Sequence, residues 1–216
     1  MVEVRYLFDP LCGWCYGAAP MLDRLRADPG IDLTLMPTGL FAGDGARAMD
    51  PGFAAYAWAN DQRIAALTGL PFTEAYRARV LTGAARFDSG PSTLALTAVR
   101  LTEPRREIDA LKAIQRARYV DGVDTSVIEA VGAVLVAEGL REAAALLAGQ
   151  DAALAEACRA RIAAAAVEMQ RFGLRGVPAL LAGGGQTWRP IRSDALFGTP
   201  ANLFEAIEPG RARRGV

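Results

Sequence analysis

Histidine is absent from this chain of 216 residues, and cysteine occurs only three times. Without histidine, any mechanism that needs an imidazole base is excluded, and the commonest ligand of a catalytic metal is missing. Lysine plus arginine and aspartate plus glutamate both number 24, so no excess of positive charge is available to bind a phosphate backbone. We therefore expect neither a nucleic-acid partner nor a metal site.

Long apolar runs are also missing, since none approaches the roughly 18 residues that a membrane-spanning helix needs. The first residues show no secretory signal, because Glu3, Arg5 and then Asp9-Pro10 interrupt the apolar positions. We expect a cytoplasmic protein with no membrane partner. The arginine-rich end follows Pro209-Gly210, which predicts a basic, disordered tail over residues 211–216.

The first part of the chain predicts a βαβ unit. Residues 2–8 alternate in polarity as in a strand with one better-buried face, and residues 31–35 repeat that pattern. Between them, the sequence from Cys12 to about Ala27 accepts a helix, which Pro29-Gly30 ends. A helical crossover of this kind makes the two strands parallel.

The remaining chain divides into a helical region and a return to strands. Residues 51–172 read as helices punctuated by glycine and proline with no convincing strand, and Ser126 with Glu129 forms a possible capping box. Residues 177–191 predict a β-hairpin, and Thr199-Pro200 predicts the start of a final helix. The predicted domains are therefore a discontinuous α/β domain over residues 1–45 and 174–210, with an inserted all-helical domain over residues 46–173.

The sharpest motif is Cys12-Gly13-Trp14-Cys15 at the start of the first predicted helix. Three helical residues advance about 4.5 Å, within the roughly 4.4–6.8 Å that a disulfide allows between its Cα atoms. The helix N-terminus favours a thiolate at Cys12, and Cys15 lies one turn deeper. We predict that Cys12 is the nucleophile and Cys15 the resolving thiol of a redox-active pair.

Cysteine pairs also occur in structural zinc sites. A zinc site needs four ligands, and only Cys158 is left to join the pair, so a metal is not expected. Cys158 lies on an apolar helical stripe and is interpreted as a core side chain, with a redox role as the alternative. Trp14 is expected to contact substrate or else to pack on the helical insertion, and Asp9 to form a turn with Pro10 or else to assist proton transfer near Cys15.

Two segments resemble the active-site segments of DsbA-like thioredoxin-fold proteins: residues 9–17, Asp-Pro-Leu-Cys-Gly-Trp-Cys-Tyr-Gly, and residues 176–179, Gly-Val-Pro-Ala. Pro20 matches a helix-kinking proline common in that superfamily, and the β-α-β, helices, β-β-α order matches over nearly the whole chain. The sequence looks closest to the predicted protein-disulfide isomerase branch, and FrnE-like proteins are similar.

The resemblance implies a thioredoxin fold with a helical insertion and a thiol-disulfide oxidoreductase or isomerase activity. It also implies that Pro178 is a cis-proline facing the cysteines and that the Val177 backbone pairs with substrate. Gly13, Trp14, Val177 and Pro178 are then the substrate-binding residues. The substrates would be protein or peptide thiols and disulfides, with glutathione as a co-substrate and no other cofactor. The lack of histidine between the cysteines favours a reductase or isomerase over a strong oxidant.

Two other functions remain open. The chain is also similar to kappa-class glutathione transferases and 2-hydroxychromene-2-carboxylate isomerases, which bind glutathione but usually carry serine at the position of Cys12. A peptide-binding, chaperone-like module using the groove near Trp14 and Pro178 is the second alternative. The oligomeric state is not indicated by the sequence.

Overall fold

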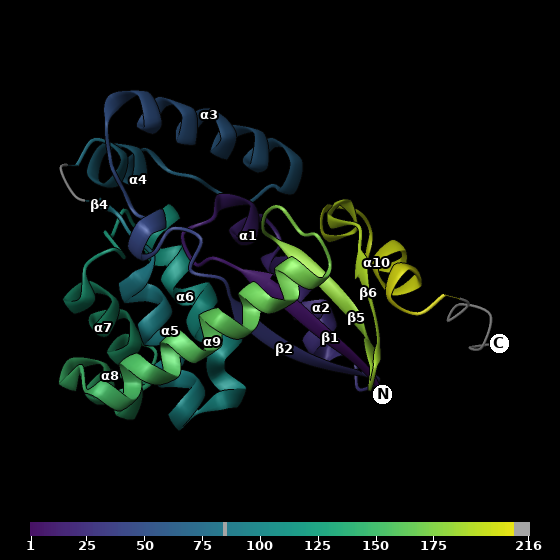
Figure 1. Ribbon diagram of the computed structural model, residues 1–216. Coiled ribbons are helices and arrows are strands. Elements are labelled where there is room, and N and C mark those ends of the chain that lie inside the picture. Colours follow the sequence, from purple (N-terminus) through teal and green to yellow (C-terminus); the bar gives the residue numbers. More distant parts are fainter. Residues whose placement is uncertain (84–85, 210–216) are drawn as a thin grey trace.

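A computed structural model describes residues 1–83 and 86–209 (Figure 1). The predicted basic tail over residues 211–216 lies outside the described residues. The sheet occupies the middle of the molecule, and helices gather on both of its faces. None of the helices in the described part has both the length and the apolar character to cross a membrane.

Four strands form the central sheet in the order β2-β1-β5-β6, with bounds β1 (Val2–Phe8), β2 (Ile31–Pro37), β5 (Ala179–Gly184) and β6 (Thr187–Ile191). β1 and β2 are parallel, whereas β5 is antiparallel to both β1 and β6. The β-α-β unit and the hairpin expected from the sequence are thus confirmed. Gly185 has a φ of 57°, which the tight turn between β5 and β6 requires.

The first helix is divided where one continuous helix was expected. α1 (Gly13–Gly17) ends at Ala18, and α2 (Ala19–Ala27) begins immediately afterwards. Pro20 lies in the first turn of α2, where a missing backbone N–H costs least. The helix expected from Cys12 to Ala27 is therefore interrupted beside Pro20, the residue that the resemblance gave as helix-kinking, and the break separates the cysteine motif from the longer helix.

The long segment between β2 and β5 is mainly helical. Its α-helices are α3 (Pro51–Thr68), α4 (Glu74–Tyr76), α5 (Gly90–Thr102), α6 (Glu107–Tyr119), α7 (Ile128–Ala137), α8 (Arg141–Gly149) and α9 (Ala152–Arg171). It also contains the 3₁₀-helices η1 (Gly43–Gly45) and η3 (Pro104–Arg106) and the π-helix η2 (Arg77–Leu81). After β6 come η4 (Ser193–Phe197) and α10 (Pro200–Ile207). The Thr199 hydroxyl accepts from the Asn202 N–H and caps α10, as expected.

Two local predictions in this segment are wrong. β3 (Arg47–Ala48) pairs with β4 (Arg86–Phe87), so a short two-stranded ribbon exists where no strand was expected beyond residue 51. Two residues are too few to show a period in the sequence. The Ser126/Glu129 capping box is also absent, because α7 begins at Ile128 and its N-cap, Val127, makes no side-chain cap.

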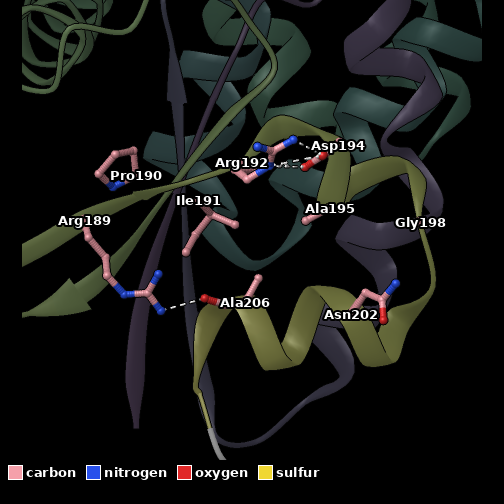
Figure 2. A pocket seen from close by; sticks show the side chains of 9 residues that line it. All are labelled: Arg189, Pro190, Ile191, Arg192, Asp194, Ala195, Gly198, Asn202 and Ala206. Carbon is pink, nitrogen blue, oxygen red and sulfur yellow. Dashed lines mark hydrogen bonds and ion pairs between the residues drawn. The ribbon is translucent and has the colours of Figure 1, made fainter.

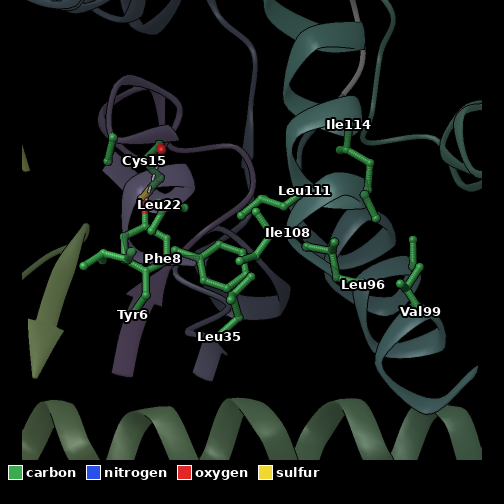
Figure 3. Packing of buried hydrophobic residues seen from close by; sticks show 14 of the residues in the cluster. Tyr6, Phe8, Cys15, Leu22, Leu35, Leu96, Val99, Ile108, Leu111 and Ile114 are labelled. Atoms are coloured by element: carbon green, nitrogen blue, oxygen red, sulfur yellow. Dashed lines mark hydrogen bonds between the residues drawn. The ribbon is translucent and has the colours of Figure 1, made fainter. Parts of the chain in front are cut away.

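The sheet is buried on both faces. Tyr6 and Phe8 stack with ring centroids 5.5 Å apart and join one hydrophobic cluster with α2, α5 and α6 (Figure 3). On the opposite face, Leu7 packs with Leu181 and the end of α9. The main cluster therefore runs without interruption from the sheet into α5–α9. The predicted domain bounds at residues 45, 46, 173 and 174 stay predictions.

Candidate functional site

Cys12 lies at the junction between the sheet and α1. Its backbone is extended, with φ −81° and ψ 116°, and its carbonyl accepts the Tyr16 N–H at 3.0 Å to open the first turn of α1. Only 7% of the side chain is exposed. The thiol Sγ lies 3.6 Å from the carbonyl oxygen of Val177, to which it donates a hydrogen bond across 165 positions of sequence.

Cys15 lies beneath Cys12 and is fully buried. Burial raises the pKa of the Cys15 thiol well above its usual value, and a hydrogen bond with the Cys12 side chain and the charge of Cys12 add to the shift. The Tyr6 hydroxyl donates to the Cys15 carbonyl at 3.2 Å. Both cysteines are free thiols in this structure. The pair therefore combines an outer sulfur, which is largely buried, with a fully buried inner sulfur that holds its proton.

The peptide bond between Val177 and Pro178 is cis, as the resemblance implied. Pro178 is buried and Val177 is half-buried immediately before β5. Because the Val177 carbonyl reaches Cys12, the fold brings together the two sequence segments on which the resemblance depended.

Gly13 and Trp14 lie between the cysteines on α1. A Cβ at Gly13 would lie 2.4 Å from Asp61 Oδ1, so no larger side chain fits there without movement of α3. Trp14 is half-buried, and its ring meets Phe197 of η4 edge-on at a centroid distance of 5.2 Å. Trp14 also packs against the apolar cluster that includes Ile64 of the helical insertion, so the predicted packing is present, and the ring contact to η4 adds to it.

A cavity of about 160 Å³ adjoins the cysteine motif. Cys12, Gly13 and Trp14 form one side of it. The rest of its wall is mostly aromatic and comes from segments far along the chain, namely Phe41, Phe53, Tyr56, Tyr76, Phe87 and Tyr119, with Asp61 and Ile64 from α3. An apolar side chain or a small thiol beside Cys12 would find a largely apolar surface there.

Asp61 is the one acidic side chain in the wall of this cavity. Burial raises the pKa of Asp61 to about 7, while the Tyr76 hydrogen bond and the charge of Arg118 oppose the shift. The Tyr76 hydroxyl donates to Asp61 Oδ2 at 3.0 Å. This carboxyl group can therefore change protonation state near neutral pH beside the cysteine motif.

Asp9 has a different environment at the end of β1. Its carboxylate accepts hydrogen bonds from Leu11 N at 2.9 Å, Phe41 N at 3.0 Å and the Ser89 hydroxyl at 2.7 Å. Burial raises the pKa of Asp9, whereas these three donors oppose that shift. The turn expected at Asp9 is present, and the same side chain also ties the cysteine loop to the helical segment.

Comparison with known proteins decides the family. A model of the DSBA-like thioredoxin domain matches residues 3–201, which is nearly the whole chain. The chain belongs to the DSBA-like thioredoxin domain family. No curated protein matches it.

Solved structures of DSBA-like and related proteins agree with this assignment. The chain is 31% identical to the cytosolic disulfide reductase DsbM from Pseudomonas aeruginosa, with a TM-score of 0.81 over 94% of this chain and 96% of that one. A proposed protein disulfide isomerase from Nitrosomonas europaea is 23% identical, with a TM-score of 0.79 over 99% of both chains. A 2-hydroxychromene-2-carboxylate isomerase shares the fold at 18% identity and a TM-score of 0.63, covering 98% of this chain and 97% of that one.

Sequence reasoning missed the part of this DSBA-like site that α3, α4 and α6 supply. Asp61 stands in the middle of α3 between Asn60 and Gln62, and nothing in that local pattern marks it as buried. Tyr76 and Tyr119 are aromatic residues in helical surroundings, which is also the pattern of ordinary core positions. Only the folded structure shows that these three side chains line one cavity together with Gly13.

Other candidate sites lie elsewhere. Cys158 is 8% exposed on α9, and burial raises the pKa of its thiol. A separate cavity of about 440 Å³ lies between β6 and α10. Arg189 donates there to the carbonyls of Ala206 and Ile207, and Figure 2 shows the first of these bonds. That cavity contains none of the predicted site residues. Across the described ranges, no three His, Cys, Asp or Glu side chains gather as a metal site would require.

Proposed function

We propose that this DSBA-like protein is a thiol-disulfide oxidoreductase that reduces disulfides through Cys12 and Cys15. The observation that carries the proposal is the difference between the two sulfurs: Cys12 borders a cavity and the Val177 carbonyl, whereas Cys15 is sealed behind it with a raised pKa. A nucleophile that borders a cavity, with a protonated inner thiol behind it, is the arrangement that a two-step exchange requires.

In the first step, the Cys12 thiolate attacks one sulfur of a substrate disulfide. A mixed disulfide forms with Cys12, and the other substrate sulfur leaves as a thiolate that takes up a proton. In the second step, Cys15 loses its proton and attacks Cys12 Sγ. The Cys12–Cys15 disulfide forms, the second substrate thiol is released, and two electrons have passed to the substrate.

We propose that an extended substrate segment approaches beside Val177 and Pro178, with Gly13 and Trp14 flanking the reacting sulfur. The hydrogen bond from the Cys12 thiol to the Val177 carbonyl supports this proposal, because it brings the backbone of that loop next to the reacting sulfur. Glutathione is a suitable small co-substrate, since two molecules can return the Cys12–Cys15 disulfide to the dithiol. The similar DsbM protein has been solved with GSH. The similarity to a cytosolic reductase also supports a cytoplasmic location.

The test is reduction of insulin and of hydroxyethyl disulfide in the presence of glutathione. Cys12→Ser is expected to abolish both reactions, and Cys15→Ser is expected to accumulate a mixed disulfide at Cys12 that mass spectrometry detects. Cys158→Ser, the same substitution at the buried cysteine of α9, serves as the matched control and is expected to retain activity. Activity of Cys12→Ser equal to that of the unmodified protein would falsify the proposal.

Two further variants separate the alternative functions. Glutathione-dependent isomerisation of a hydroxychromene carboxylate that survives Cys15→Ala would indicate an isomerase. Binding of an unfolded client that is unchanged when both thiols are replaced would indicate a peptide-binding module.

A further inference from the structure

Asp61 is placed to act on the chemistry of Cys12, although it comes from a helix far from the cysteine motif. Its side chain is buried, yet it lines the cavity that Cys12 adjoins. Oδ2 accepts from the Tyr76 hydroxyl, and Oδ1 points at Gly13, 2.4 Å from the position that a Cβ would occupy. Within residues 1–83 and 86–209, no hydrogen-bond donor reaches Oδ1. One oxygen of this carboxyl is therefore available to the cavity.

The other polar groups near Cys12 are weaker proton donors than Asp61. The Tyr119 hydroxyl from α6 donates to the Leu11 carbonyl at 2.7 Å, and the Tyr76 hydroxyl from α4 is already used by Asp61. Burial raises the pKa of both phenols. Arg118 from α6 is 1% exposed, and its charge lowers the pKa of Asp61, but it remains a cation. Two other titratable groups line the cavity: Cys12, which is the nucleophile, and Tyr56 of α3, an exposed phenol and therefore a weaker acid than a carboxyl group.

We propose that Asp61 is the general acid that protonates the thiolate leaving from the substrate when Cys12 attacks its disulfide. This rests on the proposed reductase function. As the bond between Cys12 Sγ and one substrate sulfur forms, the substrate S–S bond breaks, and its electron pair goes to the departing sulfur. That sulfur takes the proton from Asp61, which becomes a carboxylate and later recovers a proton from water.

The acidity of Asp61 suits this role at neutral pH. A carboxyl group with a pKa of about 7 is protonated in about half of the molecules at pH 7, and it is a stronger acid than an ordinary thiol, whose pKa is about 8.5. Transfer of its proton to an alkyl thiolate is therefore favourable. A carboxyl group with the usual pKa of an exposed aspartate would already be ionised.

The experiment compares two neutral disulfides in single-turnover reactions with the reduced protein. Hydroxyethyl disulfide releases a basic alkyl thiolate, whereas 2,2′-dithiodipyridine releases a group that leaves well without an acid. Asp61→Asn is expected to slow the first reaction about tenfold below pH 7 and to slow the second at most about twofold. The loss is smaller than the roughly 100-fold typical of general acids because thiolates leave readily. Glu74→Gln, an exposed acid on the α4 that carries Tyr76, is the control.

The pH profile supplies a readout that a structural role would not change. The ionisation of Cys12 affects both disulfides alike, so the readout is the rate constant for hydroxyethyl disulfide divided by that for 2,2′-dithiodipyridine. In the unmodified protein this ratio should decline above about pH 7, and the decline should disappear in Asp61→Asn. Tyr76→Phe removes a hydrogen bond that lowers the pKa of Asp61, so the decline should move to higher pH. Equal slowing of both disulfides by Asp61→Asn, or a decline that stays in place, would overturn the proposal. Failure of the reductase function itself would appear separately, as full activity of Cys12→Ser.

Discussion

The cysteine pair lies between two walls that differ in how their polar groups are satisfied. The sheet wall consists of Tyr6, Asp9, Val177 and Pro178, and the helical wall consists of Asp61, Ile64, Tyr76 and Tyr119. Asp9 accepts three hydrogen bonds, whereas Asp61 accepts one. A buried carboxylate with three donors holds a loop in place, while one with a single donor is free to exchange a proton.

The comparison indicates a division of roles. The sheet wall sets the positions of Cys12, Cys15 and the cis-proline loop through hydrogen bonds to the backbone. The helical wall surrounds the outer sulfur with aromatic rings and one titratable acid. Substitutions on the sheet wall should therefore mainly reduce stability, and those on the helical wall should mainly change pH dependence.

The largest effect is expected from Asp9→Ala. The Leu11 N–H, the Phe41 N–H and the Ser89 hydroxyl would lose their acceptor in the interior. Each donor left without an acceptor costs about 1–3 kcal/mol. Removing the buried carboxyl group of Asp9 also removes the cost of its desolvation, so we expect the free energy of unfolding, measured by urea denaturation, to fall by roughly 4 kcal/mol. Asp50→Ala, which removes one exposed N-cap of α3, should cost only about 1 kcal/mol. Equal losses would contradict the role of the sheet wall.

The pH dependence of stability should distinguish the helical wall. Asp61 keeps its proton in the folded protein up to about pH 7, where the unfolded chain has already lost it. The folded state is therefore favoured at low pH, and this contribution is lost as the pH rises from about 4 through about 7. Relative to Asp61→Asn, the unmodified protein should lose roughly 3 kcal/mol of unfolding free energy over that range. Parallel stability curves for the two proteins would rule this out.

The contact between the cysteine motif and the helical wall is tested at Gly13. In Gly13→Ala the new methyl group would meet Asp61 Oδ1 at 2.4 Å and Ile64 Cδ1 at 3.2 Å, so α1 or α3 must shift. Overpacking of this kind costs about 2 kcal/mol. Combining it with Asp61→Ala should restore about 1 kcal/mol of that loss. Gly176→Ala, whose Cβ would meet nothing within 4 Å, is the control and should be neutral.

The smallest effect concerns the edge-to-face pair of Trp14 and Phe197. A double-mutant cycle with Trp14→Leu and Phe197→Leu should give a coupling energy of about 1 kcal/mol in urea unfolding. A coupling near zero would show that the Phe197 ring does not hold Trp14 in place.

Local patterns in the sequence were sufficient for most of the α/β part of the fold. The alternation in β1 and β2, the glycine-rich turn between β5 and β6, and the Thr199-Pro200 helix start all act over a few residues. Pro20 indicated a kink in the first helix, although not a complete break at Ala18. The β3–β4 ribbon was missed, because it depends on a contact between distant residues that no short window of sequence records.

The amino-acid sequence by itself determined the chemistry that is possible: two thiols three positions apart, no imidazole, and strands and turns that build the sheet beside them. The tertiary structure decided which groups share the space around Cys12. Asp61 has an unusual pKa only because folding removes it from water and places it against Gly13. Burial and long-range contact are properties of the packed chain, so no local spacing in the sequence could reveal them.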